Sequence, residues 1–409
     1  MNILYFGSLC DKEWFNQVCH NNGTPSQVAQ FMFEKALVDG FSAKEKIEME
    51  LHYLYQEPYY PKGKFLMFKR KTKRLNQKYM VKYVSNLNLP LAKEVYSFFQ
   101  GMIRTFTWGV KNRKSKQKVI LTPFNYTPLS LGIFVASKLL RIKRVNIFTD
   151  LSSDILTSKR QQNMPLFKKM ILPLYMKLVN FVEYQYDGYV LFTEPMNQKV
   201  NPKNKPFIVM EGIFNNDLDL SEVPKQKAIM YAGTLAFEYG VKNILDAFEQ
   251  MEDEDLELWL FGDGDMKEYI EQLAIRDKRV KFFGFKPRSE VFEYEKQATL
   301  LINARNPEDE YTMYSFPSKT FEYMVSGTPF MTTNLKCIPE EYHDYLYIID
   351  PAESLNDQMH AILNKPKSEL RMKGEGARQF VLGNKSSVIQ TSTIIQLIQQ
   401  EVTGGKLMK

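Results

Sequence analysis

Three glycine turns in the C-terminal half of the sequence have the character of a phosphate-binding edge. Each follows a short apolar run and precedes a helical pattern: Gly233-Thr234, Gly262-Asp263 and Phe283-Gly284. Glycine lets the backbone approach a ligand closely, and the N–H groups at the start of a helix favour phosphate. One such turn usually serves only the geometry of the chain. Three of them in one half, in the order expected for strands ending at one sheet edge, predict a nucleotide site.

Charged residues that follow these turns supply further groups for a nucleotide. Arg305 follows an apolar run, and Lys319 and Glu322 lie near the start of a helical pattern. The two cations would neutralise a diphosphate, and the carboxylate could accept hydrogen bonds from a ribose diol. The alternative is that both cations are solvated surface charges and that Glu322 only stabilises the helix N-terminus.

The segment before Lys319 suits the entry to a helix beside this site. Ser315 or Ser318 can cap the helix, and Pro317 suits its entry. Phe316 lies within the same segment, so we expect residues 315–318 to contact the nucleotide together.

The N-terminal half offers weaker candidates. Asp150 follows the β-rich run 144–149, so it could face a donor sugar or an acceptor hydroxyl at a strand end. A helix N-cap is an equally good alternative for this residue. Asn125 follows an earlier apolar run, and Gly23 would let the first helix approach the reacting centre. Both are candidates for acceptor binding.

Composition argues against a resident metal or cofactor. The chain of 409 residues has 3 Cys, with no CxxC pair, and 4 His. This rules out a cysteine-rich zinc module. The Asp-x-Asp sequences at 217–219 and 263–265 belong to a linker end and to a glycine turn. We therefore expect no metal and no cofactor, with backbone N–H groups, Arg305 and Lys319 balancing the charge of a bound diphosphate.

Alternating short apolar runs and longer helical patterns must position these residues. A second series of alternation starts after the Pro- and Lys-rich stretch 201–206. The pattern predicts an α/β fold of two doubly wound Rossmann-like domains that face each other across a cleft. We place an N-terminal acceptor-binding domain at residues 1–200 and a donor-binding domain at 207–375. Residues 376–409 are expected to form a C-terminal helix that could pack back on the first domain.

Residues 228–335 resemble the donor-binding half of the group 1 glycosyltransferases, also called glycosyltransferase family 4. The matching stretches are Tyr231-Ala-Gly233, Leu258-Trp-Leu-Phe-Gly262-Asp-Gly264, Val280-Lys-Phe-Phe-Gly284, Phe316-Pro-Ser-Lys319 and Glu322-Tyr-Met-Val-Ser-Gly327-Thr-Pro329. The resemblance implies a GT-B fold and metal-independent sugar transfer from a nucleotide-sugar, usually with retention of anomeric configuration.

The resemblance also implies a role for each matching residue. Gly233 and Thr234 would approach the diphosphate, Gly262 would line the nucleotide pocket, and Phe283 and Gly284 would flank the base. The phosphates would be held by Arg305, Ser318 and Lys319, and the ribose hydroxyls by Glu322.

Three positions depart from the family pattern. Tyr314 stands where many members have the first of two Glu residues, and Thr149 stands where many have His. The segment after Gly233 lacks the usual Arg and Lys, whose charge Arg305 and Lys319 could supply. These departures leave open how the sugar ring is held, which sugar is transferred and with what stereochemical outcome.

Charge is divided unevenly along the chain. Residues 1–200 hold 30 Lys and Arg against 14 Asp and Glu, whereas residues 201–409 hold 24 against 33. The basic segment 62–74 interleaves cations with apolar residues, as segments at a membrane interface do. A solvated basic loop is the main alternative, and no base-reading module favours nucleic acid. Because we find no signal peptide and no spanning segment, we expect a cytoplasmic protein held at the inner face of an anionic membrane.

Together these features predict an enzyme that moves a hexose-type sugar from a nucleotide-sugar to a lipid-linked glycan. The donor is expected to be a UDP-sugar, and the pathway the assembly of exopolysaccharide, capsule or cell-wall polysaccharide. Two alternatives remain open: a nucleotide-sugar epimerase of the same fold, and a catalytically silent transferase-like partner subunit.

Overall fold

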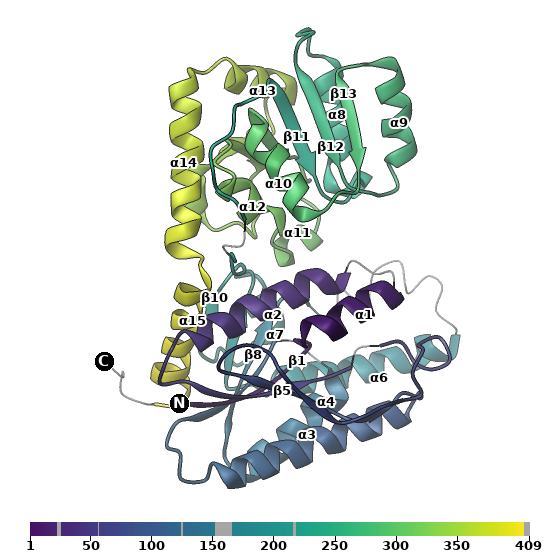
Figure 1. Ribbon diagram of the computed structural model, residues 1–409, viewed down its shortest axis with the longest axis vertical. Coiled ribbons are helices and arrows are strands. Elements are labelled where there is room, and N and C mark those ends of the chain that lie inside the picture. Colours follow the sequence, from purple (N-terminus) through teal and green to yellow (C-terminus); the bar gives the residue numbers. More distant parts are fainter. Residues whose placement is uncertain (23–25, 56, 124–125, 152–165, 216–217, 405–409) are drawn as a thin grey trace. The chain divides into compact units, whose positions relative to one another are not determined.

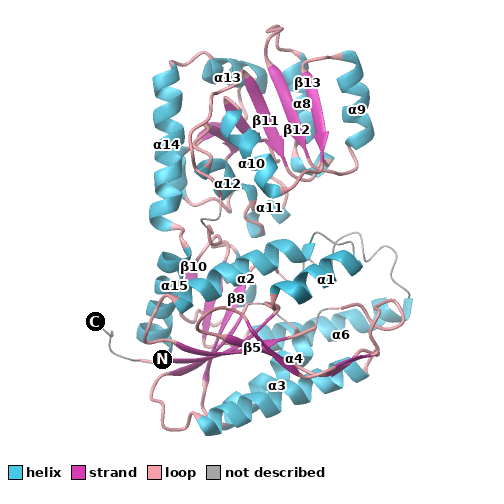
Figure 2. Cartoon of the chain, in the orientation of Figure 1, coloured by secondary structure: helices cyan, strands magenta, loops and turns pink. Residues whose placement is uncertain are grey.

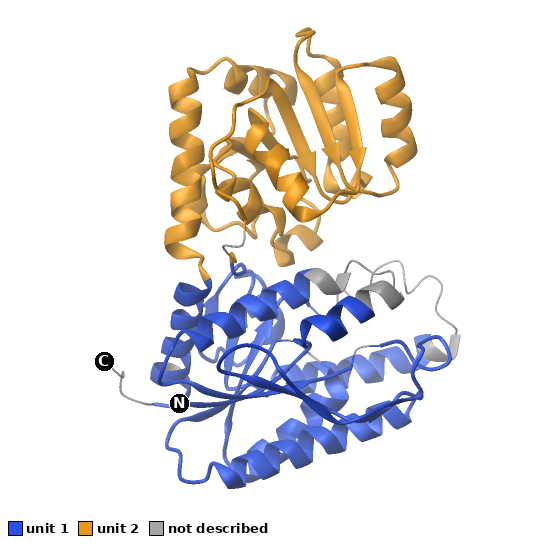
Figure 3. Cartoon of the chain, in the orientation of Figure 1, with its two compact units in different colours: residues 1–213, 387–409 blue, residues 214–386 orange. Residues whose placement is uncertain are grey.

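The chain folds as two compact units in the computed structural model (Figure 1). The structure describes residues 1–409 except 23–25, 56, 124–125, 152–165, 216–217 and 405–409. Unit 1 comprises Met1–Ile213 and Ser387–Lys409, and unit 2 comprises Phe214–Ser386 (Figure 3). Each unit has its own mainly parallel sheet with helices on both faces (Figure 2). The predicted α/β class with two Rossmann-like sheets is confirmed.

The sheet of unit 1 has the strand order β10-β9-β8-β7-β1-β2-β5-β4. Its strands are parallel except β4, which runs antiparallel to β5. A short antiparallel pair, β3 (Met67–Phe68) with β6 (Asn86–Leu87), lies beside it. The strands of the main sheet are β1 (Asn2–Gly7), β2 (Glu48–Tyr53), β4 (Lys71–Arg74), β5 (Met80–Tyr83), β7 (Lys118–Thr122), β8 (Lys143–Phe148), β9 (Gly188–Leu191) and β10 (Phe207–Val209).

The helices of unit 1 cover both faces of this sheet because its central strands are apolar on both sides. One hydrophobic cluster joins the sheet to α1, α2 and the C-terminal helices, and a second joins it to α3 and α4. The helices are α1 (Lys12–Asn22), α2 (Ser26–Ser42), α3 (Ala92–Lys111), α4 (Thr127–Leu139), α6 (Leu166–Glu183), α7 (Met196–Val200), α15 (Ser387–Gln396) and the π-helix η3 (Leu397–Val402).

The sheet of unit 2 has the strand order β13-β12-β11-β14-β15-β16, and all its pairs are parallel. The order reverses direction between β11 and β14, and ligands of such sheets bind at the carboxyl ends of strands beside this reversal. The strands are β11 (Ala228–Ala232), β12 (Glu257–Phe261), β13 (Val280–Gly284), β14 (Leu300–Asn303), β15 (Phe330–Thr333) and β16 (Tyr347–Ile349).

Two hydrophobic clusters cover the two faces of the unit 2 sheet. Side chains of α8, α9 and α13 contribute to one cluster, and those of α10, α12 and α14 contribute to the other. The helices are η1 (Phe237–Tyr239), α8 (Val241–Glu249), α9 (Lys267–Arg276), α10 (Arg288–Gln297), α11 (Tyr311–Tyr314), α12 (Lys319–Val325), η2 (Glu340–Tyr345), α13 (Leu355–Leu363) and α14 (Lys367–Asn384).

The unit boundaries lie elsewhere than the sequence predicts. Unit 1 extends past residue 200 because β10 still pairs with β9 of its sheet. The predicted helix 376–409 is wrong as a single element, because α14 ends at Asn384 and the chain then pairs with Phe214 through Ser386. Only the segment from Ser387 onward belongs to unit 1.

Among the helices that the structure describes, none is long and apolar enough to cross a membrane.

Candidate active site

The three glycine turns of unit 2 lie in mutual contact at one edge of its sheet. Gly233 N donates to Phe261 O at 3.0 Å, and Gly262 N donates to Gly284 O at 2.9 Å. A Cβ on Gly262 would lie 1.8 Å from Gly233 O, and its φ is +133°. Any side chain at this position would therefore push the first two turns apart. The turns that the sequence predicts separately form one continuous backbone surface.

The exposed residues of the first two turns stand on a hydrogen-bonded loop. Leu235 N donates to Asp263 O at 3.0 Å, and Met266 N donates back to Leu235 O at 2.9 Å. Thr234 and Asp263 are both exposed at this loop. The Gly284 turn is also open, because the nearest atom to a Cβ built there is Phe282 Cζ at 4.0 Å.

Two tyrosines to which the sequence analysis gives no role fix the first turn. Tyr323 of α12 is buried, and its hydroxyl accepts from Ala232 N at 2.6 Å and donates to Ala232 O at 3.2 Å. Tyr231 donates to Thr234 O at 3.0 Å. The position of Tyr323 in the Glu322-Tyr-Met-Val motif was a signal that could have identified it.

Arg305 lies beside this turn, at the reversal of strand order. It follows β14, the neighbour of β11, and its guanidinium carbon lies 4.6 Å from the centroid of the Tyr239 ring. Tyr239 is held there because a Cβ on Gly240 would lie 1.9 Å from Ala304 O, so the two backbones touch. Thr333 donates to Arg305 O at 2.7 Å. Among the described residues, the buried Nε of Arg305 has no hydrogen-bond partner.

Lys319 and Glu322 belong to a cluster of four charged side chains from α10 and α12, which we call the α10–α12 ion cluster. Lys319 pairs with Glu322 and lies 3.3 Å from Glu295 Oε1. The second oxygen of Glu322 accepts from Arg288 Nε at 2.7 Å. Glu295 is fully buried, whereas Lys319 is 28% exposed. The sequence analysis missed Arg288 and Glu295, which belong to none of the matching motifs.

Burial and charge oppose each other within this cluster. Burial raises the pKa of Glu295 to about 7, although Lys319 opposes the rise. Burial also acts to raise the pKa of Glu322, but Lys319 and Arg288 outweigh it and the pKa is lowered. Burial lowers the pKa of Lys319, yet Glu295 and Glu322 more than offset this and keep it raised. Lys319 and Glu322 are therefore both charged, and neither is a solvated surface group.

The segment 315–318 packs into the domain. Ser318 occupies the N-cap position of α12, but its side chain makes no capping hydrogen bond with any described residue. Phe316 is buried against Phe321, with ring centroids 5.3 Å apart. Ser315 is in an extended conformation at the end of α11, and Pro317 O accepts from Thr320 N at 2.9 Å. Phe316 thus contributes to the core.

Phe283 is also packed against other aromatic side chains. Its ring stacks on Phe261 at a centroid distance of 4.5 Å and an interplanar angle of 5°. Tyr294 of α10 lies 4.9 Å from the same ring. Phe283 is only partly buried, so one part of this stack is open to solvent beside the Gly284 turn.

A comparison with protein families identifies unit 2. Residues 215–379 match the family described as glycosyl transferases group 1. Unit 2 belongs to the group 1 glycosyltransferases. The matched residues include the glycine turns, Arg305 and the whole α10–α12 ion cluster. The match therefore assigns unit 2 to the nucleotide-sugar-dependent glycosyltransferase class.

Solved structures extend the similarity over both units of this glycosyltransferase. The apo lipopolysaccharide outer core galactosyltransferase WaaB has a TM-score of 0.59 at 13% identity, covering 97% of this chain and 99% of that chain. HepE from Anabaena in complex with UDP gives the same four values. Sucrose-phosphate synthase from Thermosynechococcus elongatus has a TM-score of 0.56 at 13% identity, covering 97% and 98%. These similarities establish the GT-B fold. No curated protein sequence matches the chain.

Among the predicted site residues of unit 1, Asp150 is the one that the structure describes. Asp150 follows β8 and is exposed, and its Oδ2 accepts from Thr149 Oγ1 at 3.2 Å. Gly23 and Asn125 lie outside the described residues, as does the segment 152–165 that Asp150 would cap. Among the described residues of this glycosyltransferase, no group of three or more His, Cys, Asp and Glu could hold a metal ion.

Proposed function

We propose that this glycosyltransferase moves a hexose-type sugar from a UDP-sugar to a lipid-linked glycan acceptor. The reaction would need no metal and would retain the anomeric configuration. The main support for binding of a nucleotide-sugar donor is the contact between the three glycine turns beside Arg305. They present backbone groups and one positive charge at the point where a parallel sheet binds its ligand.

Arg305 would stabilise the diphosphate as it leaves. Negative charge develops on the β-phosphate when the bond to the sugar breaks, and a preorganised cation lowers the energy of that state. The buried Nε of Arg305 has no partner among the described residues, so the protein leaves one N–H without a hydrogen bond. A phosphate oxygen would satisfy it at little reorganisation cost, because the ring of Tyr239 already orients the guanidinium.

The α10–α12 ion cluster would bind the nucleotide from the other side of the first turn. Both oxygens of Glu322 are paired, with Lys319 and with Arg288, yet a carboxylate retains further lone pairs for ribose hydroxyls. Lys319 is partly exposed and could turn toward a phosphate. Glu295 could then take up a proton, because its pKa of about 7 lies within the physiological range. Ser318 and the backbone of residues 315–318 would complete this side.

The donor and acceptor classes are supported by what similar proteins are described as binding. Structures of HepE contain UDP and UDP-glucose, and WaaB is a lipopolysaccharide galactosyltransferase. A lipid-linked glycan would place the enzyme at the inner face of an anionic membrane, where exopolysaccharide, capsule or cell-wall polysaccharide is assembled. Asp150, at the end of β8, is our candidate for the group that faces the sugar or the acceptor hydroxyl.

A panel of nucleotides read by thermal shift tests the donor. UDP and UDP-glucose are expected to raise the melting temperature, because a ligand that binds only the folded state stabilises it by mass action. GDP and ADP are the controls and should give smaller shifts. Stabilisation by GDP or ADP alone would contradict the UDP assignment, and no shift with any nucleotide would contradict the donor site.

One observation favours a second candidate, a catalytically silent subunit. Tyr314 replaces the first Glu of the family pattern and is buried in unit 2, where it adds no carboxylate to the edge. Release of UDP from UDP-glucose separates the two candidates. Slow release without acceptor would support the enzyme, whereas nucleotide binding without any release, with or without glycan acceptors, would support the silent subunit.

A further inference from the structure

Helix α3 of unit 1 has the reverse of the usual orientation of an amphipathic helix. Apart from Trp108, its buried residues are small or polar, and they are Lys93, Ser97, Gly101, Thr105 and Gly109. Six of its other large apolar side chains are between 38% and 58% exposed, and they are Val95, Tyr96, Phe99, Ile103, Phe106 and Val110. A helix on a soluble protein normally places such a stripe against the core. The outward stripe of α3 therefore needs a partner outside the unit.

Close packing against α4 explains why small residues face inward. A Cβ on Gly101 would lie 2.5 Å from Leu129 O, and one on Gly132 would lie 2.0 Å from Phe98 O. The two helix backbones touch at these glycines, which leaves no room for large side chains between them. The apolar stripe of α3 is thus fixed outward by the packing of the unit.

Helix α6 adds a second exposed apolar stripe on the same side of the sheet. Its exposed side chains include Met170 at 78%, Ile171 at 57%, Leu174 at 71% and Phe181 at 46%. Phe181 packs edge-on against Phe134 of α4, with centroids 5.7 Å apart. Figure 1 shows α3, α4 and α6 together on the face of the sheet opposite α1 and α2. We call the exposed stripes of α3 and α6 the α3–α6 face.

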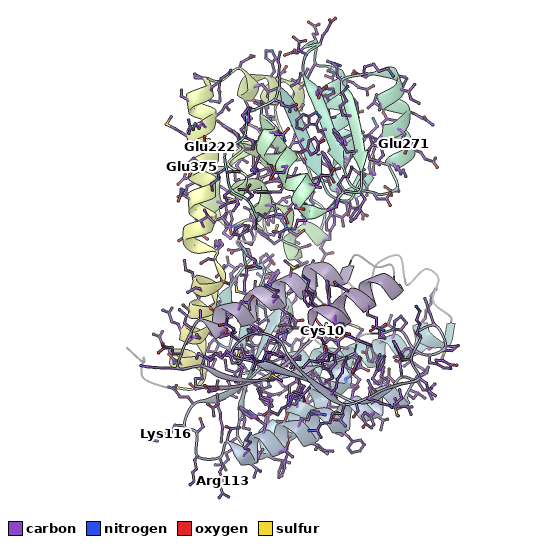
Figure 4. The ribbon with its side chains drawn as sticks, in the orientation of Figure 1. Cys10, Arg113, Lys116, Glu222, Glu271 and Glu375 are labelled. Atoms are coloured by element: carbon purple, nitrogen blue, oxygen red, sulfur yellow. The ribbon has the colours of Figure 1, made fainter. Side chains whose placement is uncertain are left out.

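Cations flank the α3–α6 face. The loop after α3 carries exposed Arg113, Lys114 and Lys116, and Figure 4 shows Arg113 and Lys116 projecting from it. Arg141 in the loop after α4 and Lys143 at the start of β8 are also exposed. The sequence of α4 contains no acidic residue, and that of α3 contains only Glu94. Apolar side chains bordered by positive charge match the acyl boundary and head groups of an anionic bilayer.

We propose that the α3–α6 face is a membrane-docking surface, on which α3 and α6 lie in the interface of an anionic bilayer. The inference deepens the proposed function. It rests on that function only for the reason to dock, which is to bring the enzyme to a lipid-linked acceptor. The aromatic and aliphatic side chains insert between lipid head groups, and the flanking Lys and Arg bind the anionic lipids. Each such cation strengthens binding to an anionic surface.

Charge argues for a bilayer over a second copy of this chain. In a twofold dimer built on this face, the same patch would meet itself, so flanking cations of one copy would lie near those of the other. That arrangement is repulsive, whereas an anionic lipid surface neutralises these charges. A second copy is therefore the competing occupant that the experiment must exclude.

Flotation of the full chain with lipid vesicles tests the proposal. The parent should float with vesicles that contain phosphatidylglycerol and much less with pure phosphatidylcholine. The variant Phe99→Gln/Ile103→Gln/Phe106→Gln keeps charge and uses a good helix former at exposed positions. It should bind phosphatidylglycerol vesicles at least roughly tenfold more weakly. The matched control is Ile275→Gln/Met372→Gln, at side chains of unit 2 that are 70% and 69% exposed.

A second variant tests the flanking charges. Arg113→Gln/Lys114→Gln/Lys116→Gln should lower binding to anionic vesicles by roughly tenfold or more and leave the weak binding to phosphatidylcholine unchanged. Failure of the parent to float, or parent-like flotation of the apolar variant, would overturn the proposal. A parent dimer that the apolar variant converts to monomer, with flotation unchanged, would identify a second copy as the occupant.

The UDP-induced thermal shift, measured on the same proteins, separates this inference from the proposed function. Loss of flotation with an unchanged UDP shift supports docking by the α3–α6 face. Flotation that depends on α3 in a chain that binds no nucleotide would leave the docking surface standing and contradict the donor site.

Discussion

Two kinds of charged residue surround the glycine turns of unit 2. Arg305 keeps a buried N–H without a protein partner among the described residues, whereas Lys319 and Glu322 satisfy each other. Sequence alone identified all three, because each follows a strand or opens a helix in a recognisable motif. It could not separate their states, since the partners Arg288 and Glu295 come from α10, which has no motif of its own.

Arg305 is expected to act on the transition state. Arg305→Ala should lower kcat for sugar transfer about a hundredfold, because the leaving diphosphate loses a preorganised cation. Arg305→Lys should recover only part of the rate, since the stacked, planar guanidinium is lost. Steady-state kinetics measure both, with Arg276→Ala, an exposed arginine at the end of α9, as the control. Parent-like kcat in Arg305→Ala would remove Arg305 from the mechanism.

Glu295 is expected to make stability depend on pH. Its pKa rises from 4.5 to about 7 on folding, so between these values the folded chain holds a proton that the unfolded chain has released. The contribution of Glu295 to the free energy of unfolding therefore falls as pH rises from 4.5 to about 7, and it is constant above pH 7. Glu295→Gln removes the fall, although it also takes an ion-pair partner from Lys319.

The measurement is the melting temperature at several pH values. The melting temperature of Glu295→Gln, relative to that of the parent, should rise as pH increases from about 5 to 8. Glu249→Gln, at an exposed position of α8, should follow the parent throughout. A difference that does not change with pH would show that Glu295 keeps an ordinary carboxylate in the fold.

At the level of elements, the sequence predicted best where a strand, a glycine and a helix follow one another. The turns after β11, β12 and β13 are such places, and the structure joins them. It predicted worst where tertiary packing sets the pattern. Helix α3 was missed because glycine-mediated contact with α4 turns its apolar stripe outward, and β10 was missed because its short sequence is a strand only beside β9.

Two of these glycines should respond very differently to alanine. Gly262→Ala places a Cβ 1.8 Å from Gly233 O in a backbone with φ +133°, so the joined turns must separate. We expect a loss of about 3 kcal/mol or more, together with loss of the UDP shift. Gly284→Ala meets open space at φ +67° and should cost only about 1 kcal/mol. Urea unfolding measures both, and equal effects would contradict the close contact of the turns.

At the level of the whole chain, the boundary between the basic and acidic residues differs from the boundary between the two units. The basic excess lies in residues 1–200, which fall within unit 1, and unit 1 also takes back the last segment of the sequence. A Cβ on Gly40 of α2 would lie 2.3 Å from Ser387 O, so α15 packs directly on α2. Sequence suggested a returning helix but could not place its start, because the chain leaves α14 only where it pairs with Phe214.

The returning segment should therefore control the stability of unit 1 and not that of unit 2. Ile398 of η3 is fully buried in the core of unit 1. Ile398→Ala should cost about 2–5 kcal/mol through lost burial and a residual cavity. Because UDP is proposed to bind unit 2, its affinity should stay unchanged. UDP should therefore raise the urea midpoint only of the unfolding transition that the substitution does not affect. Urea unfolding with and without UDP measures this, with exposed Gln396→Ala as the control. A loss of UDP affinity in Ile398→Ala would mean that the two units fold as one cooperative body.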